Sequence, residues 1–174
     1  RQECSSINEV QTTTCWYPCN KGGSYRKWYG NRDNVMNFSV TGQLEMKKQS
    51  GFRPVSLDDQ FRPSISWSDV TSDRNSFRVN GGHSLFEHAG SCAFIADDNL
   101  LPLIAYLNSS AASVMLRMIN PTLNCNAGVV SRLPLLGLGE EGRISSMAEL
   151  AIELSKTDWD SFETSWDFKR HPLL

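Results

Sequence analysis

Fifteen residues near the start of the chain combine cations, aromatic rings and glycines in a pattern that suits a polyanionic ligand. The stretch YPCNKGGSYRKWYGN, Tyr17 to Asn31, holds three basic side chains, four aromatic rings, a glycine pair and no acid. Glycines let a loop approach a phosphate closely, Lys and Arg neutralise a nucleic-acid backbone, and aromatic rings offer faces that stack on bases. The candidate binding residues here are Lys21, Gly22, Gly23, Arg26, Lys27, Trp28, Tyr29 and the following Arg32.

A second candidate surface is SISWSDVTSDRNSFRVN, Ser64 to Asn80, which is dense in Ser, Asn and Arg around Trp67. Its candidate contacts are Trp67, Arg74 and Arg78. In both stretches a second interpretation stays open. Trp28 and Tyr29 could anchor the first loop in the core while its cations are merely solvated, and the second stretch could be a polar hairpin.

Three further patterns give weaker evidence for a cofactor, metal or catalytic site. GLGEEG, Gly137 to Gly142, matches a dinucleotide-binding fingerprint, but its two glutamates and the lack of a following strand favour a linker. Cys15 and Cys19 form a CxxxC with no second pair, so we expect ordinary thiols rather than structural zinc. His83 and His88 fit no metal-ligand spacing, and no Ser, Cys or Asp stands in a nucleophile context. We therefore expect no catalysis by this chain and no metal.

Composition limits the class of protein. The 174 residues are 40% hydrophobic and 21% charged, which is ordinary for one globular domain. The net charge of -2 is uneven: residues 139–174 hold eight acids and four bases, whereas residues 10–32 hold four bases and no acid. Five irregularly spaced cysteines favour a reducing cytoplasm, and no apolar run approaches the ~20 residues that cross a bilayer. Because the chain begins at Arg1 rather than Met, we expect a piece of a longer protein.

The candidate residues fall on an expected α+β fold, with a mixed or antiparallel sheet first and helices after. Short β-favouring runs, separated by turn formers, predict strands over residues 35–40, 64–67, 76–79, 84–87 and 92–96. Residues 100–119 are rich in Leu, Ala and Met and predict two short buried helices, broken at Asn108-Ser109-Ser110 and ended by Asn120-Pro121. Residues 129–136 predict one more strand or an extended segment.

The last forty residues predict a C-terminal helix. Apolar residues recur with helical spacing over residues 144–156, at Ile144, Met147, Ala148, Ala151, Ile152 and Leu154. Trp159, Phe162 and Trp166 follow at i, i+3 and i+7, so we expect the helix to continue and to present these rings to a partner surface. The expected organisation is a domain over residues 1–136, a linker over 137–143 and a helical segment over 144–174.

Several segments resemble the PglX family of BREX-type adenine-specific DNA methyltransferases. These are YPCNKGGSYRKWYGN, SISWSDV with SFRV, FEHAGSCAFI, LIAYLNSSAASVMLRMINPTLNCNAGVVSRLPLL and SKTDWDSFETSWDFKRHPLL. The likeness runs from about Trp16 to the last residue. It implies the C-terminal specificity region of the family, which is similar to the target recognition domains of type I and type IIG enzymes.

The resemblance implies recognition of double-stranded DNA in phage defence, without catalysis. The N/D-P-P-Y/F motif that holds a flipped adenine is missing, and so is a glycine-rich cofactor loop on a first strand. S-adenosylmethionine is therefore expected in a separate methyltransferase domain of the parent, with no cofactor in this chain. The expected partners are duplex DNA, that domain and other defence proteins, with no membrane. The alternative is a protein-interaction module that binds a defence-complex partner or a DNA-mimicking phage protein.

Overall fold

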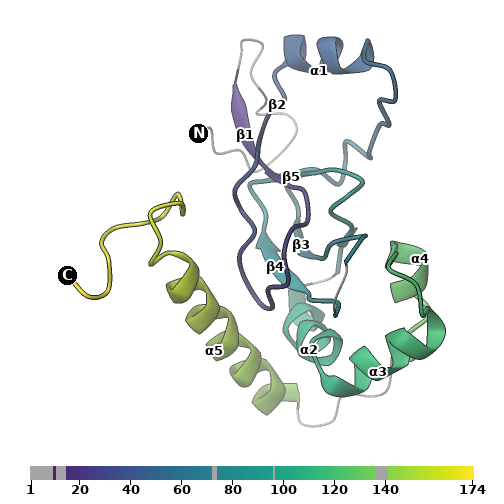
Figure 1. Cartoon of the computed structure of the whole chain (residues 1–174), viewed down its shortest axis with the longest axis vertical. Helices are drawn as coiled ribbons and strands as arrows, with labels where there is room; N and C mark the ends of the chain where they lie inside the picture. The colour runs from purple at the N-terminus through teal and green to yellow at the C-terminus, as the bar shows by residue number, and fades with distance from the viewer. Residues whose placement is uncertain (1–9, 11–14, 72–73, 96, 136–140) are drawn as a thin grey trace.

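The described residues form two small sheets and five helices, so the α+β prediction is confirmed. The structure is a computed structural model that describes residues 10, 15–71, 74–95, 97–135 and 141–174 (Figure 1). The first sheet has the order β2-β1-β5, with β2 (Val35–Asn37) antiparallel and β5 (Leu85–Phe86) parallel to β1 (Trp16–Asn20). The second is antiparallel throughout, with the order β4-β3-β6 over Arg78–Gly81, Pro63–Ser66 and Cys92–Ala93. Each predicted strand before residue 97 corresponds to one of these strands, whereas β1 was not predicted.

Each sheet has its own core. The first packs around Tyr17, Phe38, Phe61 and Leu85. The second sheet is covered by helices, and its core is larger: Ile65, Trp67, Phe77, Ile104, Leu107, Cys125, Leu116, Leu133 and Ala148. The helices that contribute to it are α2 (Asp97–Leu107), α3 (Ser110–Ile119) and α5 (Glu141–Trp159). Helix α1 (Val40–Lys47) lies at the other end of the molecule (Figure 1).

The break between α2 and α3 falls where the sequence predicted it, and it anchors the helices to the second sheet. Buried Asn108 accepts a hydrogen bond from the Phe77 amide at 3.1 Å and donates one to the Phe77 carbonyl at 3.0 Å. Ser109 then caps α3, because its side chain accepts from the Ala112 amide. The polar residue that ends α2 therefore also binds the backbone of Phe77, directly before β4.

Residues 129–136 do not form the predicted strand where the structure describes them. Ala127–Val130 form a short helix, α4, and Leu136 lies outside the described residues. Asn126 caps this helix by accepting from the Val129 amide at 3.1 Å. The cap fixes the first turn and overrides the β-preference of the adjacent valines.

Helix α5 is confirmed and packs against α2, but it buries only part of the predicted apolar set. Ala148 is buried and Ile152 packs on the core, whereas Met147 and Leu154 are 65% and 62% exposed. The predicted linker over residues 137–143 lies largely outside the described residues, and residues 141–143 already belong to α5.

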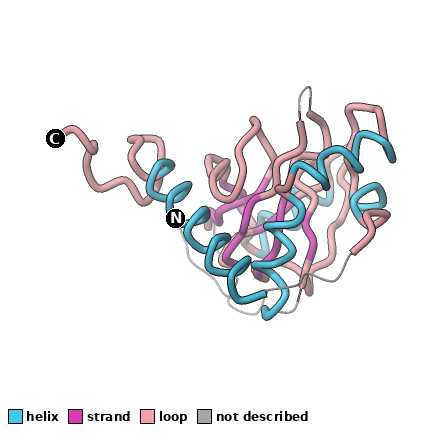
Figure 2. The backbone as a smooth tube through the Cα atoms, turned by 90° about the horizontal axis from the view of Figure 1, so that it is seen from below, coloured by secondary structure: helices cyan, strands magenta, loops and turns pink. Residues whose placement is uncertain are grey.

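The chain beyond Trp159 is not helical, so the predicted continuation of α5 is wrong. Phe162 is 54% exposed, whereas Trp159 and Trp166 are half-buried against the same domain. The last residues leave the body of the molecule (Figure 2). Within the described part of the chain, no helix alone has the length and hydropathy to cross a membrane; α2 and α3 reach those limits only as a pair bent by 67°.

Candidate nucleic-acid interface

The loop that follows β1, residues 21–32, is held against the domain by its glycines. Gly22 has a φ of +81°, and a Cβ there would stand 2.9 Å from the Ala89 carbonyl oxygen. Gly23 has a φ of +138°, and its amide and carbonyl both bond to the Ser68 hydroxyl at 2.9 Å. The close approach that the sequence assigned to a phosphate is, in this structure, an approach to the protein's own atoms: the backbone of Ala89 at Gly22 and the Ser68 side chain at Gly23.

Trp28 and Tyr29 take the anchoring role, the second of the two interpretations that composition left open. Trp28, at a φ of +72°, donates its amide to the Phe77 carbonyl at 2.8 Å and accepts from the Val79 amide at 2.9 Å. Its ring packs on the larger core, and Tyr29 is buried at 6% exposure. Tyr29 is therefore closed to stacking on a base, and Trp28 is half-buried.

Trp67 and Arg78 also lie inside the protein, so the structure corrects their assignment as surface contacts. Both are 1% exposed. The Trp67 indole donates to the Cys125 carbonyl at 2.6 Å. The Arg78 guanidinium donates to the Arg26 carbonyl at 3.3 Å, and burial lowers its pKa to about 10. Arg78 therefore holds the loop in place through its hydrogen bond to the Arg26 carbonyl.

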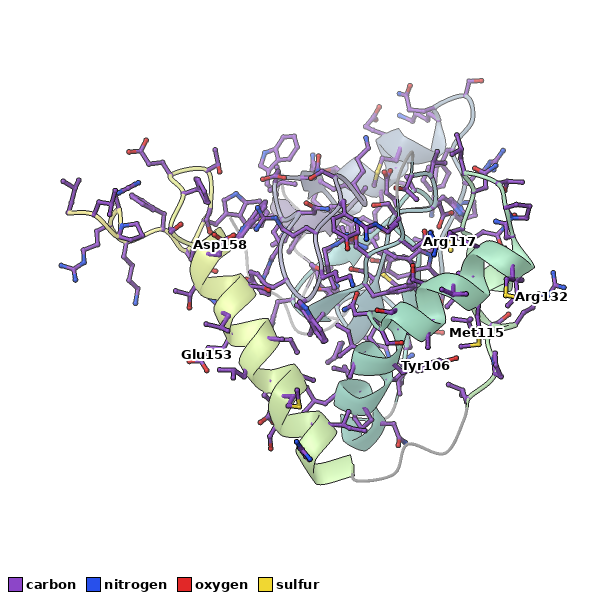
Figure 3. The ribbon with its side chains drawn as sticks, turned by 60° about the horizontal axis from the view of Figure 1, so that its bottom comes forward. Tyr106, Met115, Arg117, Arg132, Glu153 and Asp158 are labelled. Atoms are coloured by element: carbon purple, nitrogen blue, oxygen red, sulfur yellow. The ribbon has the colours of Figure 1, made fainter. Side chains whose placement is uncertain are left out.

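Two cations of the loop are engaged by the protein itself. Arg26 donates to the Asp158 carboxylate at 2.8 Å, and its guanidinium lies 5.0 Å from the centre of the Trp159 ring. Arg32 donates to the Tyr29 hydroxyl at 2.7 Å. Asp158 stands at the C-terminal end of α5, whereas Glu153 on the same helix points away from the domain (Figure 3). The C-terminal end of α5 thus binds the guanidinium of Arg26, one of the candidate binding residues of the loop.

Lys27 gathers with Arg74 and Arg117 around a hollow between the loop and α3, whereas Lys21 does not line it. Lys21 is exposed at the loop's start, 3.9 Å from Glu87. The hollow has a volume of about 150 Å³, and none of its described lining residues is acidic. Three separate chain segments supply this lining: Tyr25, Lys27, Arg74, Asn75, Ser109, Ser110, Ser113, Val114 and Arg117. We call this site the basic hollow.

The basic hollow has a partly fixed donor set. The Lys27 ammonium donates to the Asn108 carbonyl at 2.7 Å, which places it where α2 ends. The Arg74 guanidinium lies 5.7 Å from the centre of the Tyr25 ring. The Asn75 Oδ1 atom is buried and accepts no hydrogen bond from the described protein. The site therefore presents cations, hydroxyls and an amide to a ligand, with an aromatic ring at its wall.

Lys27 and Arg74 were candidates from the sequence, whereas the residues that α3 contributes to the basic hollow were not. Ser110, Ser113 and Arg117 recur at i, i+3 and i+7, so they share one face of that helix. This spacing was available in the sequence. It was overlooked because the segment was assigned to buried helices on its apolar content alone.

The weaker motifs do not assemble a further centre in the described residues. No three His, Cys, Asp or Glu side chains there converge on a common point. Burial raises the pKa of the Cys19 thiol to about 12 and that of Cys92 to about 11. GLGEEG lies mostly outside the described residues.

Two curated relatives match the chain over nearly its whole length. One is the adenine-specific methyltransferase PglX of Lacticaseibacillus casei (strain Zhang), 34% identical over 98% of this chain and 15% of the relative. Another is the adenine-specific methyltransferase BrxX of Escherichia coli O9:H4 (strain HS), 32% identical over 91% of this chain and 13% of the relative. No protein-family model matches the chain. The chain therefore spans no more than 15% of the length of these relatives, and it is homologous to a segment of the PglX and BrxX adenine-specific methyltransferases.

Proposed function

We propose that this chain is a duplex-DNA-contacting segment of an adenine-specific DNA methyltransferase of the BREX type, acting in target recognition. The observation that carries the proposal is the basic hollow, where Lys27, Arg74 and Arg117 come together from three chain segments. Cations gathered without an acid among the described lining residues suit a DNA backbone, which they position on the protein. The homology to a segment of adenine-specific methyltransferases supports DNA as the polyanion.

In this proposal the chain positions DNA and leaves methyl transfer to other parts of the parent. The adenine-holding motif is missing from the sequence, so S-adenosylmethionine and the flipped base belong to a separate domain. In this proposal polar side chains beside the phosphate contacts read base edges, with Asn75 of the basic hollow as the candidate. Arg26 joins them only when it leaves Asp158.

Hydrogen exchange in the presence of a DNA duplex tests the proposal. We expect slower exchange of amides in residues 21–27, 74–75 and 109–117, because these line or border the basic hollow. Helix α1 serves as the internal control, since it lies at the other end of the molecule and carries the exposed cations Lys47 and Lys48. Protection at α1 instead, or none at any DNA concentration, would contradict the proposal.

A second function, contact with another protein, is favoured by the outer face of α5. Met147, Leu150 and Leu154 are 65%, 56% and 62% exposed at i, i+3 and i+7, which forms an apolar stripe on the helix. We expect this stripe to cause concentration-dependent association in light scattering. Replacing its three residues by Ser should abolish the association, whereas Trp166→Ser should not, because Trp166 is half-buried in its own domain. Association that persists without the stripe would remove this second function.

A further inference from the structure

We propose that the basic hollow seats a single phosphate group, and that in the DNA complex this group is one backbone phosphodiester. The inference rests on the proposed function and identifies the side chains that bind one phosphate of the DNA. It differs from a general basic surface because it assigns one phosphate to one set of side chains. Arg117 is the principal ligand, with Lys27 and the hydroxyls of Ser110 and Ser113 beside it.

The cation at the edge of the hollow is fixed before any ligand binds. Lys27 donates one hydrogen bond to the Asn108 carbonyl at 2.7 Å, and an ammonium has two further donors. Asn108 is itself held by two hydrogen bonds to Phe77. A phosphate that binds Lys27 therefore orders little that is not already ordered, which favours a discrete site over a diffuse ion cloud.

Arg117 supplies the exposed half of the site. It is exposed on α3, and no carboxylate among the described residues lies within ion-pair distance of it. Its guanidinium is a planar fork that matches two oxygens of a phosphate. Ser110 and Ser113 lie on the same helix face, so their hydroxyls can donate to the remaining oxygens.

The size of the hollow fits the ligand. About 150 Å³ is well above the ~10–15 Å³ that one water needs, so a tetrahedral oxyanion enters with water to spare. A second cavity, lined by Asn20, Asn31 and Trp166 among others, holds only about 20 Å³ and has room for little more than one water. A larger hollow beside the end of α5 is lined by the cations Lys156, Lys169 and Arg170 but also by the acids Glu153, Asp160 and Asp167, so charge rather than size singles out the basic hollow.

Two measurements on the intact chain test the site, with Arg117→Gln as the variant and Arg132→Gln as the matched control. Arg132 is also exposed but lies beside α4 at the outer edge of the molecule, and it does not line the hollow (Figure 3). First, inorganic phosphate should shift the backbone NMR signals of Ser110, Ser113 and Asn75 saturably in the control and not in Arg117→Gln. Second, on duplex DNA, Arg117→Gln should lower the slope of log K against log salt by ~0.9, which is an about eightfold weaker affinity at 0.1 M salt.

The outcomes separate this inference from the proposed function. If the chain binds DNA and both variants keep the same slope, the single-phosphate site falls while DNA contact stands. If inorganic phosphate binds in the hollow but duplex DNA does not bind, the site stands and the proposed function falls. An acidic peptide that displaces phosphate at equal concentration would overturn the assignment of a phosphate ligand. Unchanged circular dichroism of both variants confirms that each is folded.

Discussion

Gly30 offers a sharp test of how the C-terminal segment packs on the loop. It has a φ of +124°, and a Cβ there would stand 2.9 Å from Cε3 of Trp159 and closer still to the side chain of Arg26. Gly30→Ala therefore combines a strained backbone with a clash. A left-handed alanine costs ~1–2 kcal/mol, and overpacking adds ~1–3 kcal/mol. Since Ala also restricts the unfolded chain by ~0.4–1 kcal/mol, we expect a net loss of about 2–4 kcal/mol in the free energy of unfolding.

Gly51→Ala is the matched control because it carries the backbone strain without the clash. Gly51 has a φ of +83°, and a Cβ there meets nothing within 4 Å. We expect a loss of only about 1 kcal/mol at this position. The assay is urea denaturation followed by tryptophan fluorescence and by far-UV circular dichroism. Equal losses for the two variants would refute the packing of Trp159 against Arg26 and Gly30.

Three further predictions follow from particular contacts. Asn108→Ala should lower the free energy of unfolding by about 2–4 kcal/mol in urea denaturation, because it leaves the amide of Phe77 unpaired and removes one of the two hydrogen bonds that the Phe77 carbonyl accepts. A loss below about 1 kcal/mol would contradict the anchoring role. The free energy of unfolding should fall as pH rises from 9 towards 11, because burial raises the pKa of Cys19 and Cys92 above the ordinary 9.0 and the folded state keeps those protons to a higher pH. The fall should be smaller in Cys19→Ala, and an identical pH profile in this variant would contradict the role of the Cys19 thiol. Asp158→Asn should change the free energy of unfolding by less than about 1 kcal/mol, because the ion pair between Asp158 and Arg26 is exposed. It should also tighten binding to duplex DNA because it releases Arg26; fluorescence anisotropy measures the affinity, with Glu163→Gln as the control.

Much of the fold was predictable because the deciding signals are local. Helix α5 follows from apolar spacing, and the break between α2 and α3 follows from Asn108 and Ser109, which favour caps over helix interiors. The short strands before α2 follow from β-favouring runs between turn formers. Strand β1 was missed because its residues were interpreted as part of a binding loop. Helix α4 was missed because the helix cap that Asn126 provides overrides the β-preference of Val129 and Val130.

The candidate site was only partly predictable, since its form depends on contacts between distant residues. Nothing near Arg26 in the sequence indicates that Asp158, 132 positions away, occupies its guanidinium. Arg78 and Trp67 have the residue types of a binding surface, but their burial depends on how the second sheet meets α2 and α3. Conversely, the sequence does show that Arg117 and Ser113 share one face of a helix. It does not show that this face meets the loop, because that contact depends on the break between α2 and α3 at Asn108.

The claim that the basic hollow contacts duplex DNA is tested most directly by the salt dependence of binding in paired double variants. Arg74→Gln with Arg117→Gln removes two cations of the hollow, whereas Lys47→Gln with Arg132→Gln removes two exposed cations elsewhere and keeps the same net charge. We expect the slope of log K against log salt to fall by ~1.8 in the first double variant, at ~0.9 for each phosphate that the protein no longer neutralises, and to stay at the parental value in the second. Equal slopes in the two double variants would contradict the account.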